Sequence, residues 1–263
     1  MSPTVPAQLY TGIVLYSTAD PEASALLVDG GLIAWTGPED SARVLFPDAE
    51  VVDATGCLLT PGFVDAAARL EPDEAATANA LARGIVRRLP VGTGPSEGVR
   101  VIAPLSERAD YRALLAEGVP LAFGSGGRSE DADPWAWVRA AAQEGPLEHR
   151  ISDRAAFLAA TRGGHRAAGD RAPGSLLTGG EATFVVWEPW DLTVRGQGEK
   201  FETWSTDPRS RTPLLPDLAQ GSPRALRTVI RGEVHHDVMS HGDATRDHAP
   251  QHGAADHTGE EGP

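Results

Sequence analysis

The sequence predicts a mixed α/β protein that begins and ends in β-strands and has a strand–helix–strand unit between them. Near the N-terminus, two apolar runs joined by an Asp-Gly-Gly turn in "ALLVDGGLIAW" are typical of a β-hairpin. From Phe63 onward the spacing of apolar residues changes from that of a strand to that of a helix. The alternating pattern returns in "EATFVVWEP" and "ALRTVIRGEVHHD". We therefore expect β-structure at both chain ends and an α/β layer in the middle.

Composition limits the class of protein. At 263 residues the chain can bury a sizeable core as one large domain or two smaller ones. Its formal net charge of −14 disfavours a nucleic acid or an anionic membrane as partner, because phosphate binding needs a basic face. Cys57 is the sole cysteine, which excludes an internal disulfide and a thiol-based zinc ribbon. No apolar run approaches the roughly 20 residues that span a bilayer, and no signal-peptide pattern opens the sequence, so we expect a cytoplasmic protein.

The first sixty residues are predicted to form an antiparallel β unit. "YTGIVLYS" is a candidate strand before the hairpin, and "AEVVDATGCLLTPG" contains two short strands bent at residues 53–56. The next segment, "DEAATANALARGIVRRL", predicts one helix with Ile85 and Val86 on its apolar face. Arg87 and Arg88 then lie on its wet face.

A parallel βαβ unit is predicted after this helix. It consists of the strand "VRVIAPL", a helix "ERADYRALLAEG" capped by Ser106, and the buried strand "VPLAFG". Two further helices follow in "DPWAWVRAAAQEG" and "ISDRAAFLAATRGG", the second capped by Ser152 and ending at Gly163–Gly164. Residues 238–263 are too polar to offset their own ordering entropy, which predicts a disordered tail.

Two parts of the chain, taken in order, resemble the metal-dependent amidohydrolase superfamily, in particular its imidazolonepropionase and cytosine deaminase-like branch. The front part is "LLVDGGLIAWTGPED" with "VVDATGCLLTPGFVDA", and the back part is "ISDRAAFLAATRGGHRAAG" with "GSLLTGGEATFVVWEP" and "VIRGEVHHD". The resemblance implies a β-sandwich built from both chain ends around a (β/α)₈ barrel. It also implies hydrolysis of a non-peptide carbon–nitrogen bond by water on a divalent metal such as zinc.

The same resemblance marks where this chain departs from the family. The two histidines of the family's His-x-His motif map to Ala67 and Arg69, and the metal-binding aspartate maps to Gly126. Alanine and glycine have no ligand atom, and a guanidinium is a permanent cation without a lone pair for a metal. The segment from Phe63 to Thr178 is less than half of the about 250 residues of a complete barrel. "FVDAA" resembles the first barrel strand, and "VRVIAPL" and "VPLAFG" resemble the seventh and eighth, with no counterpart evident for strands two to six.

The predicted fold is therefore α/β with a composite β-sandwich and an incomplete TIM-barrel-like layer. Residues 8–62 and 180–237 form the sandwich, residues 63–179 are the barrel remnant, and residues 238–263 are the His- and Asp-rich tail. Missing strands leave open sheet edges, from which we expect self-association or a homo-oligomer.

Other polar and reactive residues have competing interpretations. Asp65 precedes the lost motif and is expected to cap the turn rather than to bind a metal. The turn from Gly124 to Ser129 could form an anion-binding nest, but an ordinary strand-to-helix turn is favoured. His165 is expected to be structural or solvated, and Cys57 a small core residue. Four tryptophans could stack on a ring substrate, although core packing is favoured: Trp135, Trp137, Trp187 and Trp190.

Three functions follow from these patterns. The first is an amidohydrolase-family protein that has lost its metal ligands and its activity, with no catalytic residue, no cofactor and no small-molecule substrate. The second is a non-catalytic binding or assembly subunit. The third is metal buffering through six histidines near the C-terminus, whose irregular spacing favours adventitious binding: His235, His236, His241, His248, His252 and His257.

Overall fold

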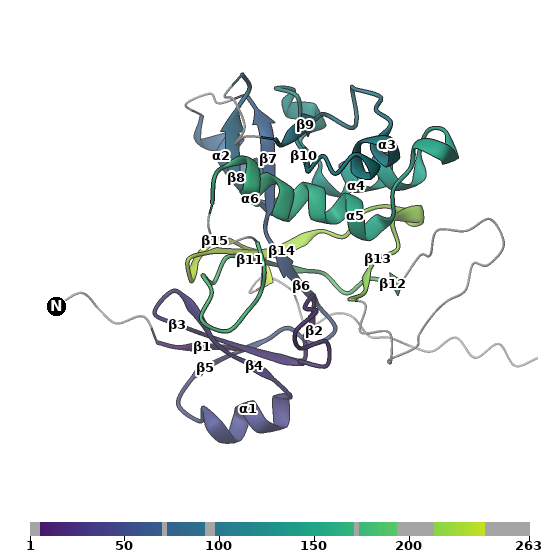
Figure 1. The fold of residues 1–263 in the computed structure, drawn as a ribbon. Coiled ribbons are helices and arrows are strands. Elements are labelled where there is room, and N and C mark those ends of the chain that lie inside the picture. The colour runs from purple at the N-terminus through teal and green to yellow at the C-terminus, as the bar shows by residue number, and fades with distance from the viewer. Residues whose placement is uncertain (1–5, 70–72, 93–97, 171–173, 194–212, 240–263) are drawn as a thin grey trace, which may run out of the picture.

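The computed structural model describes residues 6–69, 73–92, 98–170, 174–193 and 213–239. These residues form three stacked layers, with a first β-sheet at the bottom of Figure 1, a second sheet across the middle and an α/β layer above it. No helix in the described part has the length and apolar character needed to cross a bilayer.

The first sheet contains the predicted hairpin. Its strand order is β4-β3-β1-β5. β3 and β4 pair antiparallel across Gly30 and Gly31, both with positive φ, which confirms the hairpin. A short helix, α1, follows β4 and was missed in the sequence. The element bounds are β1 Gln8–Thr11, β3 Ala25–Asp29, β4 Leu32–Gly37, α1 Glu39–Leu45 and β5 Glu50–Asp53.

The second sheet combines strands from both chain ends in the order β15-β14-β11-β6-β2. Its strands are β2 Val14–Leu15, β6 Leu58–Pro61, β11 Phe184–Trp187, β14 Ala225–Ile230 and β15 Glu233–Asp237. His235 and His236 of the predicted histidine group lie in β15, whereas the four later ones fall outside the described residues. A short separate pair is formed by β12 Leu192–Thr193 and β13 Leu215–Pro216.

The N-terminal part of the chain crosses between the two sheets three times, from β1 to β2, from β2 to β3 and from β5 to β6. The prediction of a wholly antiparallel N-terminal unit is therefore wrong. β1 and β2 lie in different sheets, as do β5 and β6, and the pairs β1–β5 and β2–β6 are parallel. The crossings from β1 to β2 and from β5 to β6 run side by side, with the Gly56 N–H donating to the Gly12 carbonyl at 2.9 Å. A Cβ on Gly12 would lie 2.4 Å from Thr55 Oγ1, so the crossing requires glycine there.

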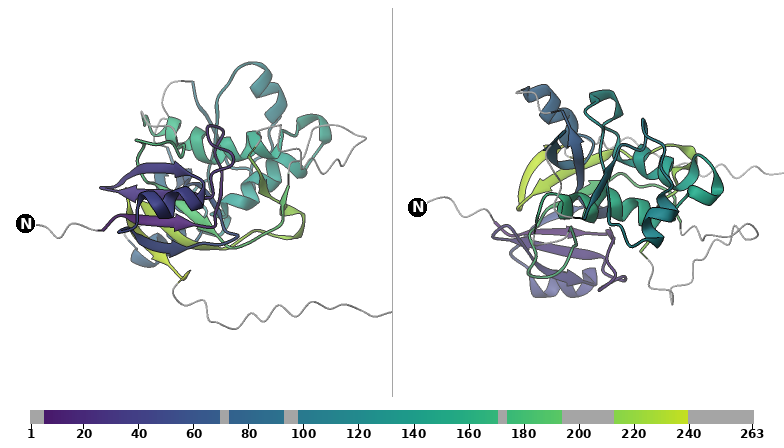
Figure 2. Two further views of the ribbon diagram at one scale, coloured as in Figure 1. Left: turned by 90° about the horizontal axis from the view of Figure 1, so that it is seen from below. Right: turned by 45° about the horizontal axis from the view of Figure 1, so that its top comes forward.

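The two sheets pack face to face, as the view from below in Figure 2 shows. Tyr10 and Leu26 of the first sheet share a core with Phe184 and Leu59 of the second, and the Tyr10 and Phe184 rings meet edge to face with centroids 5.1 Å apart. β11 is buried on both faces, because Val185 and Trp187 belong instead to the core beneath the α/β layer. This double burial accounts for the unbroken apolar run "FVVW".

The α/β layer holds two pairs of parallel strands, β7–β8 and β9–β10, and no closed barrel forms in the described part of the chain. The pair β9–β10 with α3 between them confirms the predicted βαβ unit. The bounds are β7 Phe63–Ala68, α2 Glu74–Leu81, β8 Ile85–Pro90, β9 Arg100–Ile102, α3 Tyr111–Ala116, β10 Leu121–Phe123, α4 Pro134–Gln143, α5 Asp153–Leu158, a π-helical turn Ala159–Gly163 and α6 Gly164–Ala167. Single 3₁₀ turns span Ser129–Asp131, Leu147–His149 and Leu218–Gln220.

Two predictions for this layer are wrong. The helix expected to include Ile85 and Val86 ends at Leu81, and the chain turns at Gly84, where φ is +73°, into β8. Two consecutive β-branched residues after a left-handed glycine favour a strand, so β7 has a parallel neighbour that the sequence did not reveal. Ser106 does not cap α3. That role belongs to Asp110, whose carboxylate accepts from the Ala113 N–H at 2.9 Å.

The predicted stop at Gly163–Gly164 is also wrong, although the Ser152 cap of α5 is confirmed. The helix continues through the π-helical turn into α6. A Cβ on Gly163 would lie 2.0 Å from the Leu121 carbonyl oxygen, and one on Gly164 would lie 2.5 Å from Val64 Cβ. The glycines therefore let this helix pack directly on β10 and β7, and they do not end it.

Candidate functional site

The carboxyl ends of β7 and β10 come together at one edge of the α/β layer. Ligand sites in parallel sheets lie at this end, because loops of different strands meet there. The Gly127 N–H donates to the Ala67 carbonyl at 2.7 Å, which ties the loop after β10 to β7. A Cβ on Gly124 would lie 2.5 Å from the Ala67 nitrogen, so the two backbones touch.

A buried carboxylate joins these two strand ends, and we refer to it as the Asp65 bridge. Asp65 is 2% exposed, and its Oδ1 accepts from the Ser125 N–H at 2.9 Å and from the Ala67 N–H at 3.0 Å. Its Oδ2 accepts from the Ser125 hydroxyl at 2.7 Å. Both carboxylate oxygens are therefore engaged by donors of this chain.

Burial dominates the titration of the Asp65 bridge. Desolvation raises the pKa of Asp65, and the hydrogen bonds from Ser125 and Ala67, with the nearby charge of Arg88, oppose this rise without cancelling it. Asp65 thus serves as a structural acceptor between two strands, in line with its predicted capping role.

A hollow of about 230 Å³ lies beside the bridge, and its charged lining consists of three arginines and two aspartates among mostly small and apolar residues: Arg69, Arg83, Arg88, Asp65 and Asp73. Arg83 donates to the Ala132 carbonyl at 2.8 Å, and Arg88 donates to Thr77 Oγ1 at 2.7 Å. Arg69, at the mapped position of the second motif histidine, is exposed and borders the same hollow. These three permanent positive charges oppose the binding of a divalent cation, and the two acids of the hollow already accept hydrogen bonds, Asp65 from Ser125 and Ala67 and Asp73 from the Ala75 N–H.

The residues at this edge do not fit a metal ion. The mapped positions hold Ala67, Arg69 and Gly126, and Gly126 is exposed with φ +65° in the turn after β10. Across the described ranges no group of three or more His, Cys, Asp or Glu side chains is placed to hold a metal. A catalytic divalent ion needs about three protein ligands, and Asp65 has its oxygens committed to the bridge.

Two backbone N–H groups in the turn from Gly124 to Ser129 already have acceptors and are not available to an anion. The N–H groups of Ser125 and Gly127 donate to Asp65 and Ala67 of β7, which favours a structural role for this turn. Cys57 is buried, and burial raises the pKa of its thiol to about 11, which keeps it protonated and unreactive.

The tryptophans serve packing. Trp135 and Trp187 lie in one aromatic cluster with Phe63 and Phe157, with ring centroids 4.9 to 5.8 Å apart. Trp137 Nε1 donates to the Asp131 carbonyl at 2.6 Å, and Trp190 Nε1 donates to the Asp217 carbonyl at 2.8 Å.

His165 has a partner that the sequence analysis missed. Its Nδ1 lies 2.9 Å from Asp170 Oδ2, and Arg87 contacts the other oxygen of the same carboxylate. Although burial opposes the effect, these two hydrogen bonds lower the pKa of Asp170. The sequence analysis expected Arg87 on the solvent-exposed face of a helix. Arg87 instead lies on β8 and pairs with Asp170, a contact that the helix prediction did not allow. The cluster borders a hollow of about 750 Å³ on the side of the layer that faces β14.

Solved structures of other proteins have a fold similar to that of this chain. No protein-family model and no curated protein sequence matches the chain. Among solved structures, an enamidase described as a member of the amidohydrolase superfamily aligns with a TM-score of 0.58 at 14% identity, covering 87% of this chain and 95% of the enamidase. The fold of this chain is similar to that of this enzyme. A zinc-bound adenosine deaminase from Xanthomonas campestris gives a TM-score of 0.60 at 13% identity, covering 88% of this chain and 93% of the deaminase. A zinc-complexed atrazine chlorohydrolase from Arthrobacter aurescens gives 0.57 at 12%, covering 88% and 95%.

Proposed function

We propose that this chain is a non-hydrolytic relative of the amidohydrolase enzymes and acts as a binding or assembly subunit. The likeness of fold supports an origin among hydrolases of non-peptide carbon–nitrogen bonds. In this proposal, residues 8–62 and 180–237 form the family's composite β-sandwich, and residues 63–179 are what remains of its barrel.

The observation that supports the proposal best is the Asp65 bridge. Metal-assisted hydrolysis requires an ion that lowers the pKa of a bound water, held by several ligands beside a base. At the mapped positions Ala67 and Gly126 offer no ligand atom, and Arg69 carries a permanent positive charge. Asp65, two residues before Ala67, accepts three hydrogen bonds from Ser125 and Ala67.

The test is an activity assay combined with a metal measurement. Purified, zinc-supplemented protein is assayed against cyclic amides, imidazolones and aminopyrimidines, and bound metal is measured in the full chain and in a chain ending at Met239. We expect no chelator-sensitive turnover and no stoichiometric metal in the shortened chain. Metal that is lost with the tail belongs to the tail histidines, whereas turnover that a chelator abolishes would refute the proposal.

A gain-of-ligand variant sharpens the test. Replacing Ala67→His and Arg69→His together restores the motif residues, but the Asp65 bridge remains, as do Arg83 and Arg88 in the hollow beside it. We expect this variant to stay inactive with zinc. If it hydrolyses any of the three substrate classes, the missing histidines alone account for the inactivity of the parent chain.

A further inference from the structure

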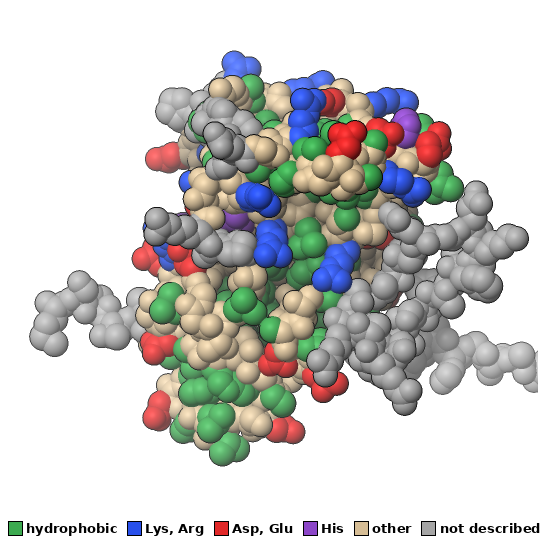
Figure 3. All heavy atoms as spheres, viewed as in Figure 1, with side chains coloured by type: hydrophobic (Ala, Val, Ile, Leu, Met, Phe, Trp, Pro, Cys, Tyr) green, Lys and Arg blue, Asp and Glu red, His purple; other side chains and the backbone are tan. Residues whose placement is uncertain are grey.

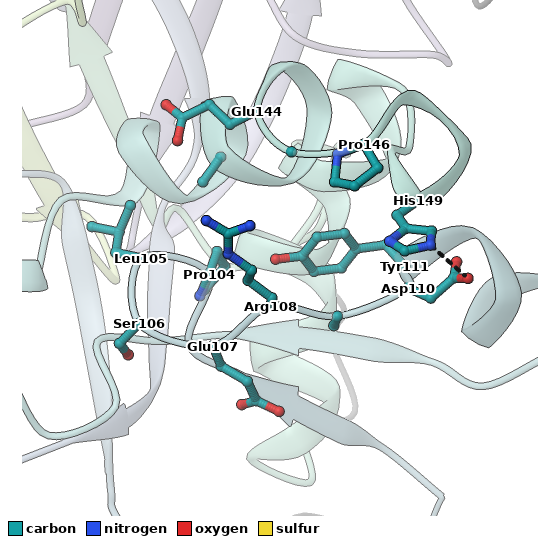
Figure 4. A pocket seen from close by; sticks show the side chains of 13 residues that line it. Pro104, Leu105, Ser106, Glu107, Arg108, Asp110, Tyr111, Glu144, Pro146 and His149 are labelled. Atoms are coloured by element: carbon teal, nitrogen blue, oxygen red, sulfur yellow. Dashed lines mark ion pairs between the residues drawn. The ribbon is translucent and has the colours of Figure 1, made fainter.

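A second hollow, unrelated to the Asp65 bridge, opens between the loop from β9 to α3 and the end of α4 (Figure 4). It measures about 560 Å³, within the usual range for sites that bind small molecules. Residues 104–111 line one side, and Glu144, Pro146 and His149 line the other. All of its lining lies in the described part of the chain.

The acidic side chains around this hollow are already paired. In Figure 4, Glu107 and Glu144 point away from its centre, and Asp110 faces His149. The pairs are Glu107 with Arg100 at 2.9 Å, Glu144 with Arg139 at 3.2 Å, and Asp110 with His149 at 3.5 Å. The charges of Glu107 and Glu144 are therefore partly balanced by arginines, and Asp110 lies against His149.

Two donors remain at the centre. Within the described residues, the guanidinium of Arg108 and the hydroxyl of Tyr111 make no hydrogen bond or ion pair with other groups, and Figure 4 shows them side by side in the hollow. The Tyr111 ring is 6% exposed and is fixed edge-on against Phe123 of β10, with centroids 5.7 Å apart. The hydroxyl is therefore held in place by the core.

We propose that this hollow binds a small organic carboxylate. A guanidinium offers two parallel N–H donors that match the two oxygens of a carboxylate, and the adjacent phenol supplies a third donor. The carbon body of the ligand would lie against Pro104, Leu105 and Pro146. This binding site is independent of whether the Asp65 region is catalytic.

The protonation states suit an anion over a wide pH range. Burial, with the nearby charges of Glu107 and Glu144, raises the pKa of Tyr111 to about 12, so its hydroxyl stays a donor at neutral pH. Arginine keeps its charge throughout this range. The same two acids disfavour a doubly charged ligand, because only one guanidinium faces the hollow, which favours a monocarboxylate over a phosphate.

The experiment measures binding of benzoate to the full chain by calorimetry, with benzamide as the neutral isostere and inorganic phosphate as the competing anion. We expect benzoate to bind at millimolar concentration or better, and benzamide at least about tenfold more weakly, because it lacks the charge. Arg108→Gln should weaken benzoate binding about tenfold or more, and Tyr111→Phe about threefold to tenfold.

Arg128→Gln is the matched control, since it removes the same charge from an exposed arginine outside the hollow. It should change benzoate affinity less than about twofold. Circular dichroism and the melting temperature establish that each variant is folded. Equal affinity for benzamide, equal competition by phosphate, an unchanged affinity in Arg108→Gln, or no binding of benzoate at about 10 mM would each overturn the proposal.

Discussion

The Asp65 bridge makes the free energy of unfolding depend on pH. Substitutions at Ser125 and Asp65 distinguish the contribution of the hydroxyl hydrogen bond from that of the carboxyl ionisation. Ser125→Ala removes the hydroxyl that donates to Asp65 Oδ2 at 2.7 Å and leaves the backbone bonds in place. A hydrogen bond to a charged group contributes about 1.5 to 3 kcal/mol, and a neutral one about 1 kcal/mol. We therefore expect Ser125→Ala to lower the free energy of unfolding by about 2 kcal/mol at pH 8, and by about 1 kcal/mol below the ordinary carboxyl pKa of about 4.

The sign follows from the raised pKa of Asp65. Folding favours its protonated form, so its contribution to stability is present below the unfolded pKa and is lost as pH rises through the folded pKa. Ser125→Ala removes a donor to the charged form and so raises the pKa of Asp65 further. The free energy of unfolding then falls more between low and high pH in this variant than in the parent. For a chain of this size, 1 kcal/mol shifts the melting temperature by about 2 to 4 °C.

Asp65→Asn gives the complementary result. The Asn oxygen can still accept from the Ser125 and Ala67 N–H groups at the place of Oδ1, and its amide can donate to the Ser125 hydroxyl, which lies 3.3 Å from the Ala67 carbonyl. We expect this variant to match or exceed the parent in stability at pH 8 and to lack the parent's decline between about pH 4 and pH 8. Chemical denaturation monitored across that range is the assay, with the exposed Ser129→Ala as control. A pH-independent loss in Ser125→Ala below about 0.5 kcal/mol, or an unchanged pH profile in Asp65→Asn, would refute the reasoning.

Three further measurements test the packing of the layers. Gly163→Ala should cost more than about 3 kcal/mol in unfolding free energy, because its Cβ would lie 2.0 Å from the Leu121 carbonyl. Gly145→Ala, which has open space at φ +73°, should cost about 1 kcal/mol, and equal losses in both would contradict close packing as the cause. Trp187→Phe should cost about 2 kcal/mol, since it removes the buried 2.8 Å bond from Nε1 to Thr60 Oγ1 and part of a ring; a change below about 0.5 kcal/mol would contradict this. In the described part β9 pairs only with β10, so we expect concentration-dependent self-association through its outer edge, and a monomer at every concentration in sedimentation would contradict it.

Sequence patterns predicted the elements whose signals are local and missed those that depend on distant contacts. The Asp-Gly-Gly hairpin and the β9–α3–β10 unit follow from turn residues and apolar spacing, and both are present. Ile85 and Val86 could extend a helix or start a strand, and only the neighbouring strand β7 decides between the two. Gly163 carries the usual signal of a helix end, yet it is small because Leu121 lies against it.

The residue types at the mapped positions can be obtained from the sequence, whereas the contacts around them cannot. Ala67, Arg69 and Gly126 can be compared with a motif from the sequence alone. The partnership of Asp65 with Ser125 cannot, because 60 residues separate them and an Asp near a strand end has many possible partners. The position of exposed apolar side chains on the surface could not be predicted from the sequence either. Figure 3 shows such side chains at the lower end of the molecule, where Val44 and Leu45 of α1 and Val51 of β5 are exposed.

The bridge also explains how two strand ends can stay together without an ion. A metal that draws ligands from neighbouring strands contributes its binding free energy to holding them together. In this chain Asp65 on β7 accepts from the Ser125 N–H and hydroxyl after β10, and the Gly127 N–H returns a bond to Ala67. From below, Trp187 of β11 packs on Phe63 at the start of β7, so the second sheet supports the opposite end of the same strand. β7 is thus fixed at its carboxyl end by hydrogen bonds and at its amino end by aromatic packing, and neither requires a closed barrel.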